Sequence, residues 1–345
     1  MHSGCLQRTG QMFSGKAAKP SVYTEIHRQR GTKMTKVDLV TGFLGVGKTT
    51  FIHRYLQYLK RQGMTASIIE NEFSGVDVDS TLLKDEGCEI SSLAGQCMCC
   101  TGKDTFRQML VEASHQGIDR VIVEPSGIYD VDEFFDVMLR EPVKSHCEIG
   151  SVLTLVDTKM DAAVTDASRY LVFAQLLAAG SIIMSKTQLF DEAQQQETID
   201  QLNALIREHG SDRVLGDDVI VKNWDDFTEE DFAVIMNSGS HLVEHEKEII
   251  DHGAVFQSGM FASRCENEED LKRRITDLMT NRKYGIVMRI KGHIRSQEGQ
   301  WYEINCSPDV MNIRPCEIKR GLFVVIGQEL NEEAIEGEAF ISRRK

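Results

Sequence analysis

The amino-acid sequence predicts an α/β protein, with a P-loop NTPase domain on a mostly parallel β-sheet and then a small α+β domain. Three observations support this fold class. A glycine-rich loop at 42–49 joins a short apolar segment to one with helical periodicity. Short apolar segments then alternate with helical ones until about residue 225, which is typical of a parallel sheet covered on both faces. Beyond residue 253, strand-like segments follow one another with one helix among them.

The elements of the first domain follow from apolar periodicity. Residues 36–40 form a short strand that leads into the glycine-rich loop. After the loop, apolar residues recur at the spacing of a helix that ends near Gly63, namely Phe51, Ile52, Tyr55, Leu56 and Leu59. The other predicted elements are strands at 67–69, 88–93, 121–123, 152–156 and 182–184, and a helix at 103–115.

The chain divides into four predicted segments. Residues 1–33 lack the apolar region of a secretory signal and are expected to be a disordered extension, or to precede the natural start. Residues 34–225 form the nucleotide-binding domain, and the acidic residues 226–252 form a helical connector. Residues 253–345 form the α+β domain, with strands at 255–257, 285–291, 301–305 and 322–326 and a helix carrying Leu271, Ile275 and Leu278 on one face.

Composition excludes several classes of partner. The formal net charge of −14 argues against nucleic acid, which requires a basic surface. No apolar run approaches the roughly 20 residues that span a bilayer. The odd number of cysteines, nine, in a chain of 345 residues argues against a disulfide framework and favours the cytoplasm. Six scattered cysteines are expected to be small apolar side chains: Cys5, Cys88, Cys147, Cys265, Cys306 and Cys316.

Gly42–Thr49 matches the phosphate-binding pattern G-x-x-x-x-G-K-[ST] and is called the P-loop below. Lys48 is predicted to reach the β- and γ-phosphates, and the Thr49 hydroxyl to bind Mg²⁺. Backbone N–H groups around the loop would point at the phosphates near a helix N-terminus. The predicted nucleotide-binding residues of this region are Gly42, Gly45, Val46, Gly47, Lys48, Thr49 and Thr50.

Two further segments are predicted to complete the nucleotide pocket. Glu124 ends the strand at 121–123, where its carboxylate would hold Mg²⁺ through water or orient the attacking water, and Gly127 would leave room for the γ-phosphate. The alternative for Glu124 is a capping carboxylate before a proline turn. Ser185, Lys186 and Gln188 stand where a GTPase carries N-K-x-D. Because Gln188 is neutral, about 1–3 kcal/mol of guanine discrimination is lost, so GTP is only weakly favoured over ATP.

Cys97, Cys99 and Cys100 form a cluster of thiols suited to Zn²⁺. Glu72 or Asp77, in the polar segment after the second strand, is the expected labile fourth ligand. Co²⁺ accepts the same ligands. A structural zinc knuckle and a thiol–disulfide pair are the alternatives. Histidines of the connector are candidate auxiliary ligands, although a solvated acidic helix explains them better: His241, His245 and His252.

With these residues placed, the chain resembles the CobW-type metallochaperone GTPases, relatives of the nickel-insertion GTPases of hydrogenase and urease maturation. The matching motifs are the P-loop, Asn71-Glu72-Phe73, the C-x-C-C at 97–100 and Glu124-x-x-Gly127, with further likeness at 285–292 and 326–330. The resemblance implies slow GTP hydrolysis, Zn²⁺ or Co²⁺ at the thiols, and metal transfer to a client. Ser74, Ser185 and Gln188 depart from the family pattern.

These inferences combine into one hypothesis. The Mg²⁺-bound triphosphate orders residues 72–87 and completes or opens the thiol site, and hydrolysis releases that segment. The candidate catalytic residues are Lys48, Glu72 and Glu124. The expected partners are a client protein that receives the metal and a homodimer that depends on nucleotide. Two alternatives stand: a zinc buffer with a vestigial P-loop, and a P-loop NTPase of corrinoid metabolism whose thiols are structural.

Overall fold

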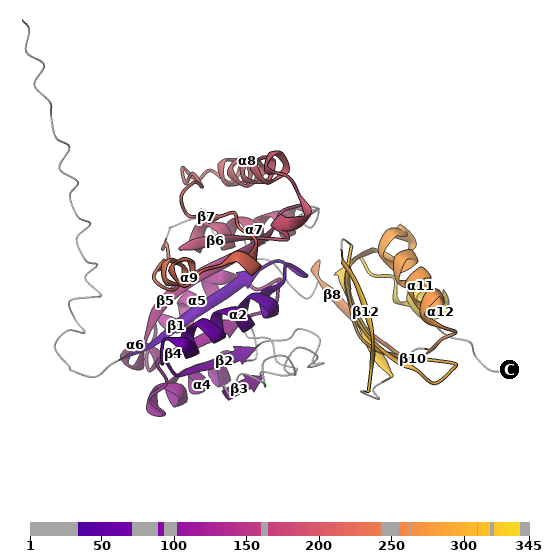
Figure 1. The fold of residues 1–345 in the computed structure, drawn as a ribbon, viewed down its shortest axis with the longest axis horizontal. Coiled ribbons are helices and arrows are strands. Elements are labelled where there is room, and N and C mark those ends of the chain that lie inside the picture. The colour runs from indigo at the N-terminus through magenta and orange to yellow at the C-terminus, as the bar shows by residue number, and fades with distance from the viewer. Residues whose placement is uncertain are drawn as a thin grey trace, which may run out of the picture. The chain divides into compact units, whose positions relative to one another are not determined.

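A computed structural model describes residues 34–70, 102–159, 165–242, 255–262, 264–308, 310–317 and 321–338, and the backbone of 89–92. The chain divides into two compact units, Met1–Lys33 and Met34–Lys345. All of the described residues belong to the second unit. It contains two β-sheets, each with its own helices (Figure 1).

The first sheet has seven strands in the order β3-β2-β4-β1-β5-β6-β7, and every neighbouring pair is parallel. Its central strands β1 and β4 pair Val37 with Val121 and Leu39 with Val123. The alternation of strands and helices in the sequence therefore predicted the fold class correctly. The strands are β1 (Thr35–Gly42), β2 (Ala66–Glu70), β3 (Glu89–Ser92), β4 (Arg120–Glu124), β5 (Cys147–Asp157), β6 (Ser181–Ser185) and β7 (Val219–Ile220).

Helices cover both faces of the parallel sheet. On one face lie α2 (Lys48–Arg61) and α9 (Glu229–Met236). On the other lie α4 (Lys103–His115), α5 (Val131–Met138), α6 (Val143–His146), α7 (Asp166–Ala178) and α8 (Glu192–Glu208). Single turns occur at η1 (Thr187–Leu189) and η2 (Trp224–Asp226). Among the described residues, no helix combines the length and the apolar character that crossing a membrane requires.

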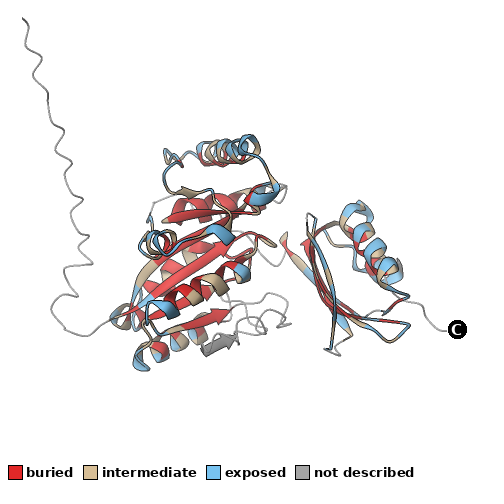
Figure 2. Cartoon of the chain, viewed as in Figure 1, coloured by how far each residue is buried: buried red, intermediate tan, exposed pale blue. Residues whose placement is uncertain are grey.

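The doubly covered sheet explains why its strands read as continuous apolar runs. In β1, Val37 and Leu39 face the cluster beneath α4, α5 and α7, whereas Val40 faces the cluster beneath α2. Successive side chains of a strand point to opposite faces, and here both faces are buried. The buried colour in Figure 2 accordingly runs through the central strands of the sheet.

The second sheet has the order β12-β11-β10-β13-β8, with β9 beside β10. Its strands are β8 (Gln257–Ala262), β9 (Arg264–Cys265), β10 (Ile286–Ser296), β11 (Trp301–Ser307), β12 (Val310–Cys316) and β13 (Leu322–Gln328). The neighbours along the main path are antiparallel, as the sequence predicted. α11 (Glu268–Thr280), η3 (Arg282–Tyr284) and α12 (Glu332–Glu338) accompany it. Leu271, Ile275 and Leu278 of α11 are buried on one face of this C-terminal sheet.

The acidic stretch between the sheets differs from the predicted helical connector. Its helix, α9, ends at Met236, and residues 237–242 are not helical. Phe232 and Ile235 are buried against α2, because their apolar side chains complete the core on that face of the parallel sheet. His241 lies beyond the helix end, and its backbone N–H donates to the Ala178 carbonyl, 3.0 Å away. The predicted helical connector therefore does not extend through His241.

Candidate functional site

The P-loop connects β1, which ends at Gly42, to α2, which begins at Lys48. Gly47, at the N-terminus of α2, has φ of 98°, a left-handed conformation that favours glycine. A Cβ atom there would also lie 3.2 Å from Cη2 of Trp224. The loop therefore requires glycine at this position for two reasons. It presents the N-terminus of a helix, which favours a bound anion.

Lys48 lies where its motif predicts. Its side chain is almost fully buried, and Nζ donates to the carbonyl oxygens of Gly42 at 2.9 Å and Phe43 at 3.4 Å. Because both of these acceptors belong to the P-loop, the ammonium group is held against the loop that would carry the phosphates. Lys48 also lines the cavity described below.

Thr49, in the first turn of α2, lies beside Glu124, the last residue of β4. The Thr49 hydroxyl donates to the Glu124 carboxylate, 3.1 Å to Oε1 and 3.4 Å to Oε2. Glu124 ends β4, the parallel neighbour of β1, so both side chains leave the same edge of the sheet. A hydroxyl and a carboxylate side by side are the oxygen donors that Mg²⁺ prefers. The donor set of these two residues thus fits a magnesium ion.

Gly127 has a closer neighbour than the sequence predicted. A Cβ atom on Gly127 would lie 2.6 Å from the backbone nitrogen of Leu44 and 2.9 Å from its Cα. The space that a side chain would occupy is filled by the P-loop itself. Gly127 is not among the residues that line the cavity. It therefore connects the turn after Glu124 to the loop by direct packing.

The segment in the place of the guanine motif follows β6. Ser185, Lys186 and Gln188 line the same cavity as the P-loop. Lys186 has φ of 60°, and its Nζ forms an ion pair with Asp157 at the end of β5. Ser185 is buried, and its hydroxyl has no hydrogen-bond partner in the part of the chain that the structure describes. The segment at the end of β6 thus contributes to the same cavity as the P-loop.

Lys48, Thr49 and Glu124 line one cavity of about 350 Å³, together with Ser185, Lys186 and Gln188. It is lined by more basic than acidic side chains, although the whole chain has a net charge of −14. The basic ones are Lys48, Arg54, Lys186, Arg289 and Arg314, and the acidic ones are Glu124, Asp225 and Glu303. A local excess of positive charge in an acidic protein favours an anionic ligand such as a polyphosphate.

Two groups of cavity residues were missed by sequence reasoning. Asn223, Trp224 and Asp225 follow β7, a strand of two residues that is too short to give an apolar pattern. The Trp224 indole N–H donates to the Met184 carbonyl at 2.9 Å, and Arg54 forms an ion pair with Asp225. The second group comes from the C-terminal sheet: Arg289, Glu303, Asn305, Ser307, Val310, Asn312 and Arg314. Of this group, Arg289 stands in the stretch 285–292 that the family resemblance marked, and the other six stand outside the marked stretches.

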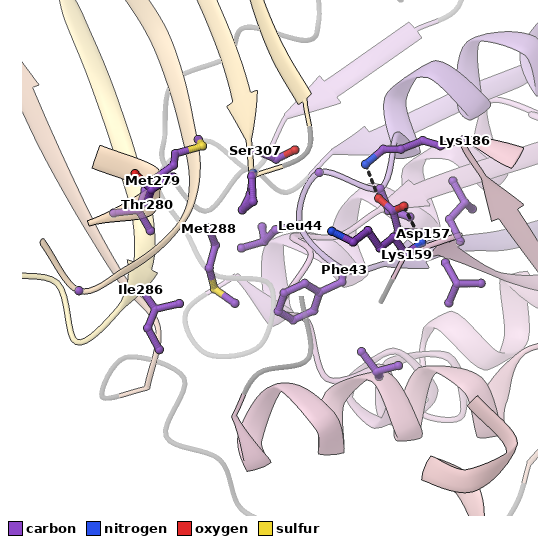
Figure 3. A pocket seen from close by; sticks show the side chains of 18 of the residues that line it. Phe43, Leu44, Asp157, Lys159, Lys186, Met279, Thr280, Ile286, Met288 and Ser307 are labelled. Atoms are coloured by element: carbon purple, nitrogen blue, oxygen red, sulfur yellow. Dashed lines mark hydrogen bonds and ion pairs between the residues drawn. The ribbon is translucent and has the colours of Figure 1, made fainter. Parts of the chain in front are cut away.

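A second, more apolar cavity of about 260 Å³ adjoins the P-loop. Figure 3 shows Phe43 and Leu44 of the loop on one side, and Ile286 and Met288 of β10 on the other. The Lys186–Asp157 ion pair forms part of its wall. Lys186 lines both cavities, so they share the segment that follows β6.

The predicted metal ligands lie outside the described residues: Cys97, Cys99, Cys100, Glu72 and Asp77, together with His245 and His252. Within the described ranges, no group of three or more His, Cys, Asp or Glu side chains is arranged to hold a metal. Cys147, Cys265 and Cys306 are buried, as predicted for scattered cysteines, and Cys316 is half-buried. Burial raises the pKa of the Cys147 thiol to about 12 and that of Cys265 to about 11. These two thiols are therefore protonated at neutral pH.

The sequence was then compared with known proteins. Residues 36–211 match the family described as CobW/HypB/UreG, nucleotide-binding domain. The zinc chaperone YeiR of Escherichia coli is 30% identical over 53% of this chain and 54% of its own length. The zinc chaperone CobW of Pseudomonas aeruginosa is 31% identical over 38% of each chain. The zinc-regulated GTPase metalloprotein activator 1 of Schizosaccharomyces pombe is 30% identical over 50% of this chain and 44% of its own length.

Among solved structures, Zn(II)-bound YjiA GTPase from E. coli aligns over 90% of this chain and 99% of its own, with 20% identity and a TM-score of 0.42. The chain spans about half or less of the length of the curated relatives described above. The sequence match lies mainly in the part that contains the parallel sheet.

Proposed function

The chain belongs to the CobW/HypB/UreG family, and on this premise we propose that it is a GTP-hydrolysing metallochaperone. It binds Zn²⁺ through Cys97, Cys99 and Cys100 and passes the ion to a client protein. Co²⁺ is the alternative ion. Nucleotide state controls when the metal is held and when it is released.

The observation that carries the proposal is the cavity shared by Lys48, Thr49 and Glu124. Lys48 is buried against the P-loop carbonyls, ready to bind the β- and γ-phosphates. Thr49 and Glu124 would hold Mg²⁺, which neutralises charge on the phosphates when it is bound. Glu124 would also orient the attacking water, with Glu72 as a further candidate from the segment outside the described residues.

The path of the chain supports a link between the thiols and the nucleotide. β3 ends at Ser92 and is parallel to β1, so the chain leaves the sheet there at the same edge as the P-loop. Three strand spacings separate β3 from β1, roughly 14 Å. Cys97 comes five residues later, a stretch that reaches at most roughly 17 Å. The thiol motif is therefore within reach of the nucleotide edge.

GTP is the proposed nucleotide, with ATP as the alternative to be tested. Gln188 lines the cavity but carries no charge with which to accept the guanine N–H groups. We expect its base discrimination to be weaker than that of an aspartate by about 1–3 kcal/mol. Gln188→Asp should therefore increase the ratio of GTP to ATP affinity.

We further propose that the protein works in the cytoplasm, where free thiols persist, with the client and a nucleotide-dependent homodimer as its protein partners. Cysteine thiols lose their protons when they bind metal as thiolates, so Zn²⁺ affinity should rise with pH across the range in which the cysteines titrate.

The central experiment measures Zn²⁺ affinity of the full chain with a non-hydrolysable GTP analogue and with GDP. The proposal expects the two affinities to differ, and it expects GTP hydrolysis to respond to stoichiometric Zn²⁺. Equal affinities with metal-insensitive hydrolysis would refute the coupling. A protein that binds Zn²⁺ but hydrolyses neither GTP nor ATP would instead be a zinc buffer.

A matched pair of variants locates the metal. Cys99→Ser with Cys100→Ser should abolish Zn²⁺ binding in a protein that is folded and still hydrolyses GTP. Cys316→Ser, a half-buried thiol of the C-terminal sheet, should change neither property. Unfolding of the Cys99/Cys100 variant would show that the thiols are structural.

A further inference from the structure

The C-terminal sheet provides one wall of the cavity that contains the P-loop. Its strands alternate, so that one set of side chains packs under α11 and the other set faces away from it. Ile290, Ile304 and Cys306 belong to the buried set. The opposite set includes Arg289, Asn305 and Arg314, which line the cavity together with Lys48 and Thr49.

The P-loop and the end of β11 are in close contact. A Cβ atom on Gly45 would lie 3.1 Å from Cβ of Ser307. The antiparallel register that pairs Ile290 with Cys306 places Arg289 opposite Ser307 on the neighbouring strand. Adjacent strands are about 5 Å apart, which is less than the length of an arginine side chain. The Arg289 guanidinium is therefore within reach of a group held by the P-loop.

The partners of the cavity's basic side chains differ in charge. Lys186, Arg54 and Arg314 each form an ion pair, with Asp157, Asp225 and Glu303 respectively. Arg289 instead donates to the neutral amide oxygen of Asn305, 3.3 Å from Nε and 3.1 Å from Nη2. Among the described residues, no ion pair involves Arg289. Arg289 thus brings a positive charge into the cavity while it is held by a neutral oxygen atom.

We propose that Arg289 is a phosphate-binding residue, which the C-terminal sheet supplies to the terminal phosphate of the nucleotide. A guanidinium group forms strong, charge-assisted hydrogen bonds with phosphate oxygens. Asn305 orients the group without neutralising it. Because the contact joins the two sheets through the γ-phosphate, it gives the C-terminal sheet a direct means of distinguishing triphosphate from diphosphate. The role of Arg289 rests on one part of the proposed function, namely that the P-loop binds a nucleoside triphosphate.

The test measures binding of GDP and of a non-hydrolysable GTP analogue to the full chain without Zn²⁺. Arg289→Gln should lower the affinity for the triphosphate by about tenfold or more, the effect of losing a charge-assisted hydrogen bond, and lower GDP affinity much less. Asn305→Asp, which keeps the shape but pairs the guanidinium with a carboxylate, should act in the same direction. Arg289→Lys should recover part of the loss.

Arg295→Gln is the matched control. Arg295 lies on the same strand, above the Trp301 ring, and does not line the cavity. It should leave both affinities unchanged. The proposal would be overturned if Arg289→Gln bound the triphosphate as tightly as the parent does. It would also be overturned if the substitution lowered the affinities for the triphosphate and for GDP equally. A parent chain that binds neither nucleotide would refute the proposed function itself, and the zinc experiment above tests the rest of that function separately.

Discussion

The two sheets of this protein contribute to the cavity in different ways. The parallel sheet is buried on both faces, and its functional residues stand at one edge, where Lys48, Thr49 and Glu124 follow strand ends. The C-terminal sheet is buried under α11 on one face, and its cavity residues lie along the strands on the other. In the first sheet the functional side chains lie at the ends of strands and helices, and in the second they alternate with core side chains along the strands.

This difference predicts how substitutions act. Residues at the edge of the parallel sheet can be changed with little effect on its core, because loops carry few core contacts. On the C-terminal sheet, a polar residue that lines the cavity alternates with a core residue along the same strand. A substitution that affects ligand binding and one that affects stability can therefore be neighbours in the sequence. The predictions below test this contrast.

The largest effect is expected from Lys48→Ala. The substitution removes the ammonium group that stabilises the phosphates, so GTP hydrolysis should fall by about 100- to 1000-fold. Denaturant unfolding of both sheets should change little, because the side chain donates to two carbonyls of its own loop. A large loss of stability would show that the edge of the parallel sheet is not separable from its core.

The next effect is expected from Ile304→Ala, in the buried set of β11. Ile304 is fully buried, so the void that the substitution leaves in the core should destabilise the C-terminal sheet by about 3 kcal/mol. The two tryptophans report on the two sheets separately: Trp224 lies beside the P-loop and Trp301 begins β11. Fluorescence of Trp301 in a Trp224→Phe background should therefore show the loss. Ile122→Ala, in the parallel sheet, is the matched variant and should shift the Trp224 signal.

A smaller effect is expected from Gly127→Ala. The new methyl group would meet the Leu44 backbone and displace the P-loop, so GTP affinity should fall by about tenfold, the equivalent of about 1.4 kcal/mol. Gly216→Ala has open space around the new atom and is the control. Titration with a fluorescent GTP analogue compares the two. Unchanged affinity in Gly127→Ala would mean that the loop adapts without cost.

The smallest effect concerns Asp270, near the N-terminus of α11. Partial burial opposes its ionisation, but hydrogen bonds from Arg274, the Glu266 backbone and Arg273 outweigh it and hold the pKa at about 2. Because this value is below the usual aspartate pKa of about 3.9, the carboxylate stabilises the fold above that pH and loses its effect as pH falls toward 2. Asp270→Asn should cost about 1 kcal/mol at pH 7 after solvent screening.

Urea unfolding of Asp270→Asn and the parent at several pH values, followed through Trp301, provides the measurement. The difference between the two proteins should disappear near pH 2. A stability difference that is constant with pH would mean that the substitution acts through packing. A change in the unfolding reported by Trp224 would mean that the substitution also affects the parallel sheet.

Much of the fold was predictable because its signals are local. Helix α2 begins and ends where its apolar spacing and Gly63 indicated, and α4 has the predicted bounds. The antiparallel strands of the C-terminal sheet were also predicted. The connector was not predicted correctly. Its acidic composition indicated a solvent-exposed helix, yet α9 buries Phe232 and Ile235 against α2. Charge counts describe the exposed face of an amphipathic helix and say nothing of the element that covers its other face.

The sequence by itself determined the P-loop, with Lys48 and Thr49 at fixed positions, because wrapping a phosphate imposes glycines and a helix start within a few residues. Tertiary structure alone decided that Gly127 packs on Leu44, that Trp224 packs on Gly47, and that Arg289 faces the P-loop. These contacts join segments distant in the chain. They depend on sheet order and strand register, which the pairing of whole strands sets and no local pattern specifies.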